Sequence, residues 1–322
     1  MTTTRGLGPL PRDARVHVAG HGGLVGSAVW RNLEQHGFDS LLGRTSTELD
    51  LRDREAVFTF FDEERPEYVV LAAARVGGIL ANASEPADFL SDNLRIQVNV
   101  LDAAYTFGVE RLLFLGSSCI YPRSADQPIK ESSLLTGPLE PTNDAYAIAK
   151  IAGVLQVQAL RRQHEASFIS AMPTNLYGPG DNFDLAGSHV LPAMIRRFHQ
   201  ATVAGSGSVT LWGTGTPRRE FLHVDDLARA ALFLLENYDD PSPINVGVGV
   251  DLSVMALAEL VAEVAGFTGS IEWDRAKPDG TPQKLLDVSR IQELGWSAEI
   301  PLDEGVRSTY RWYVEHLGDL RA

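Results

Sequence analysis

The chain has 322 residues, of which 44% are hydrophobic and 22% are charged, a composition typical of a globular protein. Its formal net charge of −14 argues against nucleic acid as the main partner, because a phosphate backbone is bound by a basic surface. No apolar run approaches the roughly 18 residues that a membrane span needs, and the polar segment 1–15 lacks the apolar core of a secretory signal. A single cysteine, Cys119, excludes an intrachain disulfide and fits a reducing cytoplasm.

Short β-branched or leucine-rich runs alternate along the chain with amphipathic stretches. The predicted strands are residues 16–19, 40–42, 68–73, 111–115, 167–172 and 244–246. The predicted helices are residues 23–36, 55–64, 86–107, 145–163 and 225–237. This alternation predicts an α/β fold, a Rossmann-type, doubly wound parallel sheet with helices on both faces.

The composition changes after Thr174. Residues 175–219 and 273–284 are rich in glycine, proline and charged side chains, and are expected to be loops and short elements at the carboxyl ends of the strands. We therefore expect a dinucleotide-binding domain from residues 1–175, continued by about 225–250. Residues 176–224 and 251–322 are expected to form a smaller substrate-binding lobe.

A glycine-rich turn follows the first predicted strand and opens the first predicted helix. Gly20 permits the tight turn, Gly23 allows close approach of a pyrophosphate, and Gly26 lets the helix pack on the strand. Gly22 lies inside the turn. The predicted dinucleotide site also includes Leu24 and Val25, the first residues of the helix.

The second predicted strand ends at Arg44, at the position where an NAD site usually carries an acidic residue. An arginine there can pair with a 2′-phosphate, which favours NADP; the alternative is a solvated surface arginine. Asp50 and Leu51 follow and are suitably placed for the adenine edge.

Tyr146 and Lys150 lie four residues apart and so share one face of a predicted helix. A fixed cation favours the phenolate, which would make Tyr146 a usable proton donor to a carbonyl that receives hydride. Ser117 ends the fourth strand, where it can bind the same oxygen. In extended backbone Cys119 would point to the same side as Ser117, either as a reactive thiol or as a small buried side chain.

With these residues in place, the chain resembles the extended short-chain dehydrogenase/reductases, and within them the GDP-L-fucose synthase family, from about residue 16 to about residue 313. The resemblance rests first on Ala19-Gly-His-Gly-Gly-Leu-Val-Gly26, Val76-Gly-Gly-Ile79, Leu115-Gly-Ser-Ser-Cys-Ile-Tyr-Pro122 and Glu140-Pro-Thr-Asn-Asp-Ala-Tyr-Ala-Ile-Ala-Lys150. It continues in Met172-Pro-Thr-Asn-Leu-Tyr-Gly178, Asp181-Asn-Phe183, Trp212-Gly-Thr-Gly-Thr-Pro217 and Lys277-Pro-Asp-Gly-Thr-Pro282.

The resemblance implies 3,5-epimerisation of GDP-4-keto-6-deoxy-D-mannose, followed by reduction of carbon 4 with NADPH to GDP-L-fucose. It implies that Cys119 is the base and His189, directly before a helix, the acid at carbons 3 and 5. Tyr146 would protonate the carbon-4 oxygen, Lys150 would hold the nicotinamide ribose, and Ser117 would orient the keto oxygen. Further implied cofactor contacts are Leu115, Gly116, Ser117, Ser118, Lys150, Pro173, Thr174, Asn175, Leu176 and His189. Implied substrate contacts are Arg197, Trp212, Arg219, Asp279 and Lys284; no metal site is expected.

The chain departs from the family pattern at Gly22, where the family carries an arginine that helps to hold the 2′-phosphate. NADP remains the expected cofactor, with a smaller margin over NAD. The alternatives are another nucleotide-sugar 4-epimerase or 4,6-dehydratase of the same family and, more remotely, a non-catalytic dinucleotide-sensing regulator. Related enzymes commonly pair through helices equivalent to 86–107 and 145–163, so a homodimer is expected.

Overall fold

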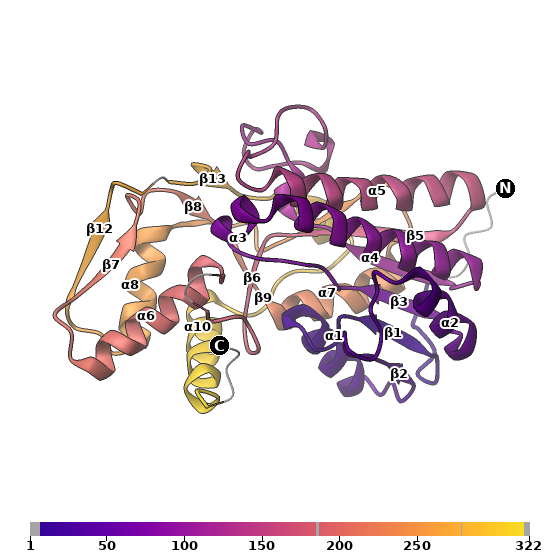
Figure 1. Ribbon diagram of the computed structural model, residues 1–322, viewed down its shortest axis with the longest axis horizontal. Coiled ribbons are helices and arrows are strands. Elements are labelled where there is room, and N and C mark those ends of the chain that lie inside the picture. The colour runs from indigo at the N-terminus through magenta and orange to yellow at the C-terminus, as the bar shows by residue number, and fades with distance from the viewer. Residues whose placement is uncertain (1–6, 185–186, 278, 319–322) are drawn as a thin grey trace.

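A parallel sheet of six strands, in the order β10-β5-β4-β3-β1-β2, forms the centre of the fold (Figure 1). The computed structural model describes residues 7–184, 187–277 and 279–318. The strands of this sheet are β1 (Val16–Ala19), β2 (Leu41–Leu42), β3 (Tyr68–Leu71), β4 (Arg111–Leu115), β5 (Ser167–Pro173) and β10 (Ile244–Val246). The predicted Rossmann-type fold class is confirmed, since every pairing in the sheet is parallel. Residues 1–6 of the polar segment 1–15 lie outside the described residues.

Two groups of long helices cover the faces of the sheet. On one face α1 (Leu24–Gln35) packs against α7 (Val224–Asn237). On the other, α4 (Pro86–Thr106) packs against α5 (Asp144–His164) and α2 (Arg54–Glu64) (Figure 1). These bounds lie within one residue of the predicted ones. The short helices α3 (Ile79–Ser84) and α9 (Ser289–Glu293) were not predicted.

The strand order identifies the place on the sheet where folds of this type bind ligands. β1 has β2 on one side and β3 on the other, so the order reverses between β1 and β3. In open α/β sheets this switch point opens a crevice at the carboxyl ends of the strands. The glycine turn follows β1 and therefore lies at that crevice.

A smaller group of elements lies beyond the carboxyl ends of the sheet strands (Figure 1). Its paired strands are β7 (Ser208–Trp212) with β12 (Ser270–Asp274), β6 (Asn175–Tyr177) with β9 (Phe221–His223), and β8 (Arg218–Arg219) with β11 (Leu252–Ser253) and β13 (Gln283–Lys284). Its helices are α6 (Val190–Ala204), α8 (Val254–Val264) and α10 (Leu302–Glu315).

The expectation of loops and short elements for residues 175–219 is wrong over α6, which has 15 residues. The buried side chains Leu191, Met194, Ile195 and Phe198 recur at helical spacing and pack inward, which stabilises this helix. In the stretch 273–284 the described residues contain the last two residues of β12 and the two-residue strand β13, which agrees with the expectation of loops and short elements there.

The buried hydrophobic side chains form two clusters. The first includes Val18, Val70 and Leu113 of the six-stranded sheet, and the second includes Phe198 and Tyr313 of the smaller group. Residues 286, 288, 291 and 296 pack into the first cluster, although in the sequence they lie between β13 and α10 of the smaller group. The division of the chain into two domains stays a prediction.

Glu220 lies between these two clusters and joins separate segments of the chain through hydrogen bonds. Its side chain is fully buried, and its carboxylate accepts hydrogen bonds from the backbone N–H groups of Val248 at 2.6 Å, Gly249 at 2.7 Å and Leu286 at 3.0 Å. Its backbone carbonyl accepts a hydrogen bond from the Asn175 side chain at 2.7 Å. Because a buried carboxylate is costly unless it is paired or hydrogen-bonded, these contacts hold the segments in one arrangement.

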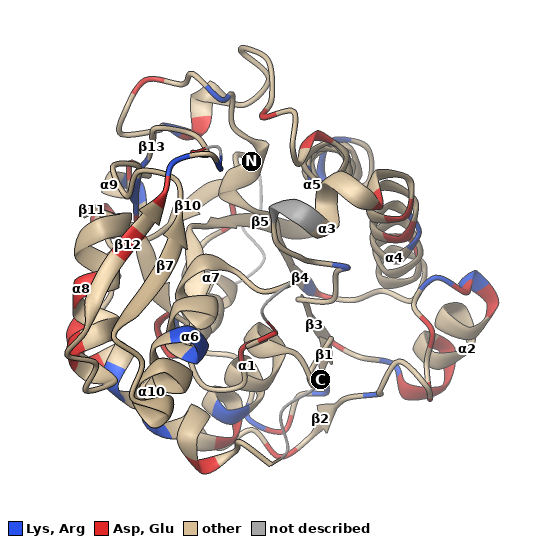
Figure 2. Cartoon of the chain, turned by 60° about the vertical axis from the view of Figure 1, so that its left-hand side comes forward, with Lys and Arg blue, Asp and Glu red and all other residues tan. Residues whose placement is uncertain are grey.

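Acidic and basic side chains are distributed over both groups of elements, and the strands β1, β3 and β5 carry none (Figure 2). Across residues 7–184, 187–277 and 279–318, no helix combines the length and the apolar character needed to cross a bilayer. The same residues contain no group of three or more His, Cys, Asp or Glu side chains arranged for a metal ion.

Candidate active site

The glycine turn after β1 offers an open cradle at the N-terminus of α1. A side chain at Gly20, where φ is +86°, would lie 2.9 Å from the Ala73 backbone, and one at Gly26 would lie 2.0 Å from the Gly20 carbonyl oxygen. At Gly22, by contrast, a Cβ would meet nothing within 4 Å, so this part of the turn faces open space. The first turn of α1 carries no acidic residue and Gly23 provides no side-chain cap, which leaves its N–H groups for an anion.

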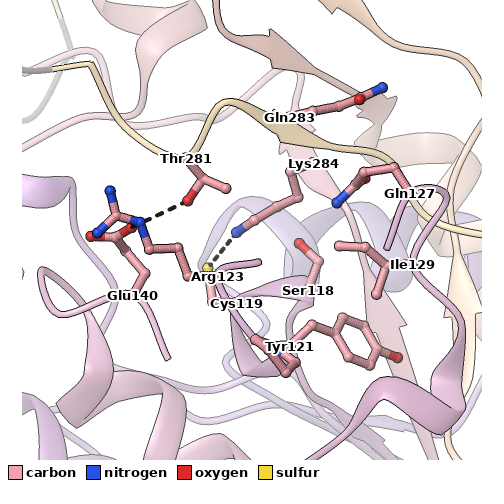
Figure 3. Close-up of a pocket in the computed structure, with 11 residues that line it drawn as sticks. Ser118, Cys119, Tyr121, Arg123, Gln127, Ile129, Glu140, Thr281, Gln283 and Lys284 are labelled. Carbon is pink, nitrogen blue, oxygen red and sulfur yellow. Dashed lines mark hydrogen bonds and ion pairs between the residues drawn. The ribbon is translucent and has the colours of Figure 1, made fainter. Parts of the chain in front are cut away.

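Cys119 lies beside the ammonium group of Lys284. The Nζ of Lys284 donates a hydrogen bond to the Sγ of Cys119 at 3.5 Å (Figure 3). Burial alone would raise the pKa of the thiol. The Lys284 charge, together with hydrogen bonds from Ser117, Lys284 and Asn143, outweighs burial, so the pKa of Cys119 is lowered. The thiolate is the reactive form of cysteine, and this environment favours it.

The backbone around Cys119 differs from the extended strand that was expected. Residues Ser118–Ile120 form a 3₁₀ turn, and the Ser117 hydroxyl oxygen accepts a hydrogen bond from the Cys119 N–H at 3.2 Å. The expectation that extended backbone aligns the two side chains is therefore wrong. The turn nevertheless brings both Ser117 and Cys119 within range of Tyr146, whose pKa both groups affect.

Tyr146 is half-buried at the start of α5, and its pKa is raised. Burial is the main cause, the negative charge of Cys119 adds to it, and a hydrogen bond with Ser117 opposes it. The Nζ of Lys150 lies 5.9 Å from the centre of the Tyr146 ring and donates a hydrogen bond to the Leu115 carbonyl at 2.8 Å. Burial lowers the pKa of Lys150 to about 8. The sequence-based expectation that Lys150 lowers the pKa of Tyr146 is not met in this structure.

His189 is the N-cap of α6 and is exposed. Its segment packs against the turn after β3, where the Gly78 N–H donates to the Gly187 carbonyl at 3.0 Å. Burial by surrounding atoms lowers the pKa of His189, and the charge of Lys284 lowers it further. Lys284 therefore acts on both His189 and Cys119.

Arg44 lies at the end of β2, but its guanidinium has protein partners. It forms an ion pair with Glu64, lies 5.4 Å from the centre of the Phe60 ring, and donates to the Gly43 carbonyl at 2.8 Å. Because position 22 of the glycine turn carries glycine and not the arginine of the family pattern, Arg44 has no basic neighbour from position 22. A 2′-phosphate there would compete with Glu64 for Arg44.

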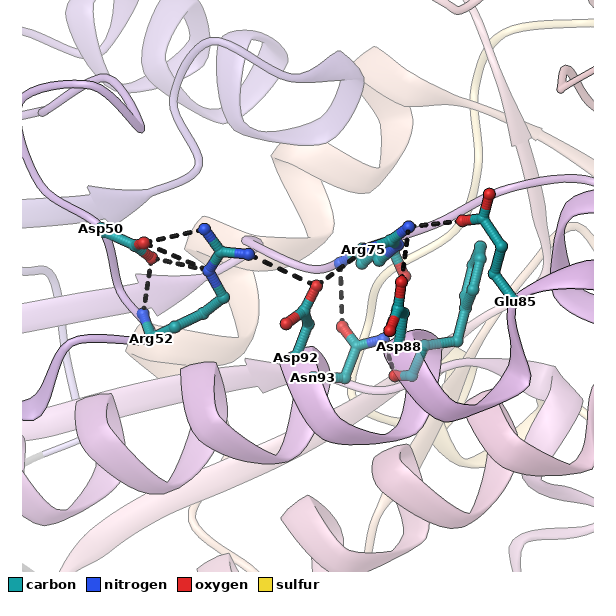
Figure 4. Close-up of polar contacts among 8 residues, drawn as sticks. Asp50, Arg52, Arg75, Glu85, Asp88, Asp92 and Asn93 are labelled. Carbon is teal, nitrogen blue, oxygen red and sulfur yellow. Dashed lines mark hydrogen bonds and ion pairs between the residues drawn. The ribbon is translucent and has the colours of Figure 1, made fainter.

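A chain of ion pairs borders the expected adenine edge (Figure 4). Asp50 accepts from the Nε and Nη2 of Arg52 at 2.9 and 2.8 Å, which lowers the pKa of Asp50, and Arg52 also reaches Asp92 at 3.5 Å. Asp92 in turn pairs with Arg75 at 2.9 Å. The Asn93 side chain holds the Arg75 backbone through both its oxygen and its nitrogen. The network fixes the loop after β3 against α4.

The remaining expected cofactor residues lie at the carboxyl ends of neighbouring strands. Leu115 ends β4 and Gly116 follows it, and Pro173 ends β5, which pairs with β4. Thr174 joins β5 to β6, and Asn175 and Leu176 are the first two residues of β6. With Ser118 in the turn after β4, they share the edge of the sheet that carries Ser117 and the glycine turn.

Of the expected substrate residues, Arg219 and Lys284 lie close to Cys119. They face each other across the β8–β13 pairing, and burial lowers the pKa of Arg219 while the charge of Cys119 opposes that effect. Trp212 is 48% exposed, so it is not a core residue, and the Nζ of Lys277 lies 5.3 Å from its ring centre.

The other two expected substrate residues are held by loops and strands of the smaller group. The Asp279 carboxylate accepts from the Thr214 N–H at 2.9 Å and from the Thr214 hydroxyl at 2.7 Å. The Arg197 side chain donates to the Thr210 carbonyl at 3.1 Å. Pro278, inside the motif that contains Asp279, lies outside the described residues.

Two features of this site escaped the sequence-based prediction. Asn143 is close enough to Cys119 to help lower the pKa of the thiol; its place three residues before Tyr146, at the start of the same helix, was the available signal. Glu140 binds Arg123 at 3.2 Å and Thr281 at 3.3 Å, which ties the β13 segment to the segment before α5 (Figure 3). Nothing in the sequence indicates that contact, because the partners lie far apart along the chain.

Comparisons with known proteins agree with this geometry. The sequence profile described as "NAD dependent epimerase/dehydratase family" matches residues 16–247. The chain belongs to this family. It is 56% identical over 306 residues to "GDP-L-fucose synthase 1" of Arabidopsis thaliana, covering 95% of each chain. It is 52% identical over 311 residues to "GDP-L-fucose synthase" of Escherichia coli (strain K12), covering 94% of this chain and 97% of that one.

A solved structure of a "gdp-l-fucose synthetase from Naegleria fowleri bound to NADP" superimposes with a TM-score of 0.89 at 29% identity, covering 98% of both chains. The curated relatives match the chain over nearly its full length, so the smaller group of elements is shared as well as the six-stranded sheet.

Proposed function

We propose that this member of the family is a GDP-L-fucose synthase. It inverts carbons 3 and 5 of GDP-4-keto-6-deoxy-D-mannose and then reduces carbon 4 with NADPH, giving GDP-L-fucose. The observation that carries the proposal is the thiol of Cys119, which accepts a hydrogen bond from the ammonium of Lys284, has a lowered pKa, and is close enough to Tyr146 to raise the pKa of that phenol. A reductase or 4-epimerase that makes no change at carbons 3 and 5 has no use for such a thiol.

The epimerisation is assigned to Cys119 and His189. The 4-keto group acidifies the protons on carbons 3 and 5, so a modest base can remove them and leave an enolate. The Cys119 thiolate takes the proton from one face of the sugar ring, and the imidazolium of His189 returns one to the other face. Hydrogen bonds to the carbon-4 oxygen from Ser117 and Tyr146 stabilise the enolate.

The reduction is assigned to Tyr146 with Ser117 and Lys150. NADPH, when bound, supplies the hydride to carbon 4. Tyr146 gives its proton to the oxygen of that carbon, and its raised pKa keeps the proton available until the oxygen becomes basic. Ser117 orients the oxygen, and Lys150, fixed by the Leu115 carbonyl, holds the ribose.

The chain offers a fitting cradle for this cofactor. The open turn at Gly22 and Gly23 and the uncapped N-terminus of α1 suit the pyrophosphate. Arg44 would hold the 2′-phosphate, with Asp50 and Leu51 at the adenine edge. The remaining proposed contacts are Gly20, Leu24, Val25, Gly26, Leu115, Gly116, Ser118, Pro173, Thr174, Asn175, Leu176 and His189.

The GDP part is assigned to the smaller group of elements. Arg197 and Arg219 suit the pyrophosphate because a guanidinium can bind phosphate oxygens with two parallel hydrogen bonds. The exposed ring of Trp212 offers a stacking surface. Asp279 and Lys284 complete the proposed contacts.

Solvent labelling tests the proposal. The protein is mixed with NADPH and GDP-4-keto-6-deoxy-D-mannose in deuterated water, and the product is examined by NMR. We expect deuterium at carbons 3 and 5 and the stereochemistry of GDP-L-fucose. A product without solvent deuterium at either carbon would mean simple reduction or 4-epimerisation, and consumption of no NADPH would point to a non-catalytic binding protein.

The enzyme is further proposed to work as a cytoplasmic homodimer. Four large hydrophobic side chains on α4 and α5 are exposed between 36% and 46%: Val98, Tyr105, Ile148 and Leu155. These two helices pack side by side, so the four residues offer an apolar surface to a second copy. Light scattering of the wild-type protein and of Ile148→Asp checks this, with a halved mass expected for the variant.

A further inference from the structure

The contact between Lys284 and Cys119 depends on where the β13 segment is held. β13 has two residues, Gln283 and Lys284, and its pairing with β8 is equally short. The Lys284 side chain is long and flexible, and fixing it costs conformational entropy. Because its Nζ nevertheless lies 3.5 Å from the thiol sulfur, the backbone on either side of Lys284 has to be fixed by further contacts.

Glu140 holds the chain at Thr281, which precedes Lys284 on the same segment. The Thr281 hydroxyl donates a hydrogen bond to the Oε2 of Glu140 at 3.3 Å, and the Nε of Arg123 pairs with the same oxygen at 3.2 Å (Figure 3). The other carboxylate oxygen, Oε1, accepts a hydrogen bond from the Thr142 hydroxyl at 3.3 Å. With partners on both oxygens, the carboxylate is fixed in orientation and faces Thr281.

Gln127 and Ile129 hold the residue that follows Lys284. The Leu285 N–H donates to the Oε1 of Gln127 at 2.8 Å, and the Leu285 carbonyl accepts from the Ile129 N–H at 2.7 Å. Both partners belong to residues 123–140, the segment that also holds the chain on the other side of Lys284. We call residues 123–140 the anchoring segment, because its contacts fix the backbone on both sides of the lysine.

The anchoring segment and the thiol border one small cavity. Cys119 lies in the turn that precedes this segment, and the cavity beside it is also lined by Glu140, Thr281 and Lys284 (Figure 3). Its volume is about 10 Å³, whereas a single water needs roughly 10–15 Å³. On this side a thiolate is therefore stabilised by the neighbouring ammonium more than by solvent, and that stabilisation depends on the distance between Nζ and Sγ.

We propose that Glu140 and Thr281 are positioning residues that hold the ammonium of Lys284 against the thiol of Cys119. Neither of them takes part in a proton transfer. Resting on the proposed function, the contact that they hold keeps the base of the epimerisation deprotonated before the substrate arrives. The carboxylate of Glu140 is itself negative, so its charge alone would make the thiol a weaker acid. The position and the charge of Glu140 therefore have opposite effects on the thiol, and an experiment can separate them.

Valine and serine at position 281 test the hydrogen bond to Glu140. Thr281→Val removes the hydroxyl with little change of shape, and Thr281→Ser keeps the hydroxyl. The rate of alkylation by iodoacetamide as a function of pH, measured without substrate, reports the thiolate fraction of Cys119, which is the single cysteine of the chain. Thr281→Val is expected to raise the midpoint of this profile by about one pH unit, a roughly tenfold loss of thiolate below both midpoints. Thr281→Ser is expected to keep the wild-type midpoint.

Glu140→Ala separates position from charge. The midpoint of alkylation rises in this variant if Glu140 holds Lys284 in place, and falls if Glu140 acts by its charge alone. In a Lys284→Met background, Thr281→Val should leave the midpoint unchanged, because the ammonium that Thr281 helps to position is absent. Thr136→Val is the matched control: Thr136 is an exposed residue of the anchoring segment whose hydroxyl donates to the Ser133 carbonyl, and its loss should leave the wild-type midpoint.

Solvent labelling connects the contact to turnover. Near neutral pH, Thr281→Val should label carbons 3 and 5 about tenfold more slowly than wild type, and this difference should shrink as the pH rises above the alkylation midpoint of the variant. A merely structural role of Thr281 would lower the labelling rate equally at every pH. A Kd for NADPH within about twofold of the wild-type value shows that the variant is folded.

An unchanged alkylation midpoint in Thr281→Val overturns the positioning role. A lowered midpoint in Glu140→Ala overturns it as well, and so does a full rise caused by Thr281→Val in the Lys284→Met background. If wild type labels neither carbon in deuterated water, the proposed function fails, while the alkylation midpoints still decide whether Glu140 and Thr281 position Lys284.

Discussion

The ammonium of Lys150 donates a hydrogen bond to the Leu115 carbonyl at 2.8 Å and lies 5.9 Å from the centre of the Tyr146 ring. It is therefore positioned by the end of β4 and not by the phenol oxygen. The groups that set the protonation of Tyr146 are its burial, the charge of Cys119 and the hydroxyl of Ser117. A negative thiolate next to the phenol keeps the proton on Tyr146, so base and acid can be present together in the states that the proposed reaction needs.

Tyr146→Phe should stop the reduction and spare the epimerisation. Removing the phenolic proton donor is expected to lower the rate of NADPH oxidation by roughly 10²- to 10⁴-fold, as is usual for general acids. Deuterium exchange at carbons 3 and 5 and the affinity for NADPH should remain measurable. Absorbance at the NADPH band, NMR and calorimetry provide the three readouts, and unchanged turnover would contradict the role of Tyr146.

Cys119→Ser should impair epimerisation far more than dinucleotide binding. A serine hydroxyl is a much weaker acid than a thiol, so the Lys284 charge cannot keep it deprotonated near neutral pH. Deuterium labelling at carbons 3 and 5 is expected to fall by about 10²-fold or more, while the Kd for NADPH changes less than about twofold. Equal losses of labelling and of NADPH binding would show that Cys119 is structural.

Arg44 and Glu64 should shift the preference for the phosphorylated cofactor in opposite directions. Arg44→Ala should remove the proposed charged hydrogen bond to the 2′-phosphate, a kind of bond worth about 1.5–3 kcal/mol, so the KM for NADPH should rise roughly 10- to 100-fold. Glu64→Gln frees Arg44 from its ion pair and should lower that KM. The KM for NADH, which has no 2′-phosphate, serves as the control. Parallel changes for both cofactors would exclude a 2′-phosphate contact of Arg44.

Asp181 should make stability fall as the pH rises from about 4 to about 7. Burial raises the pKa of Asp181 to about 7, and its Oδ2 has no hydrogen-bond partner among the described residues. Its folded pKa thus exceeds its unfolded pKa. In this window the unfolded chain has lost a proton that the folded chain retains, so folding becomes less favourable by up to about 4 kcal/mol.

Asp181→Asn removes this dependence. The variant should match wild type near pH 4 and have a higher free energy of unfolding near pH 8, measured by urea titration at both pH values. Asp53→Asn is the comparison, since Asp53 is an exposed helix cap and should not show a gain confined to high pH. Equal stability of Asp181→Asn and wild type at pH 8 would mean that Asp181 is solvated in the folded state.

The strands and helices that depend on local pattern were predictable. The bounds of β1, β4 and β10 agree with the predicted ones, because short apolar runs between polar turns mark buried parallel strands. The helix α6 was underestimated, because the glycines and prolines before residue 190 and after residue 204 dominate the composition of that stretch. Its helical spacing is visible when residues 190–204 are read alone.

The residue types of the candidate site were predictable from the sequence, but their mutual geometry was not. The turn at Ser118–Ile120 replaces extended backbone, and the Lys284–Cys119 contact joins residues 165 positions apart. Contacts of this kind depend on how β13 docks beside the end of β4, which no local pattern specifies. For the same reason the partner of Arg44, Glu64, could not be named in advance.

The single carboxylate of Glu220 bonds to three backbone amides drawn from the turn after β10 and from the chain after β13. For protein engineering, these bonds mean that residues far apart in the sequence have to be exchanged together. A chimera that exchanges the smaller group of elements for that of a relative must therefore keep the residues around positions 220, 248 and 286 from the same parent. If a crossover point separated any two of these positions, the buried Glu220 carboxylate would lose hydrogen-bond partners in the hybrid protein.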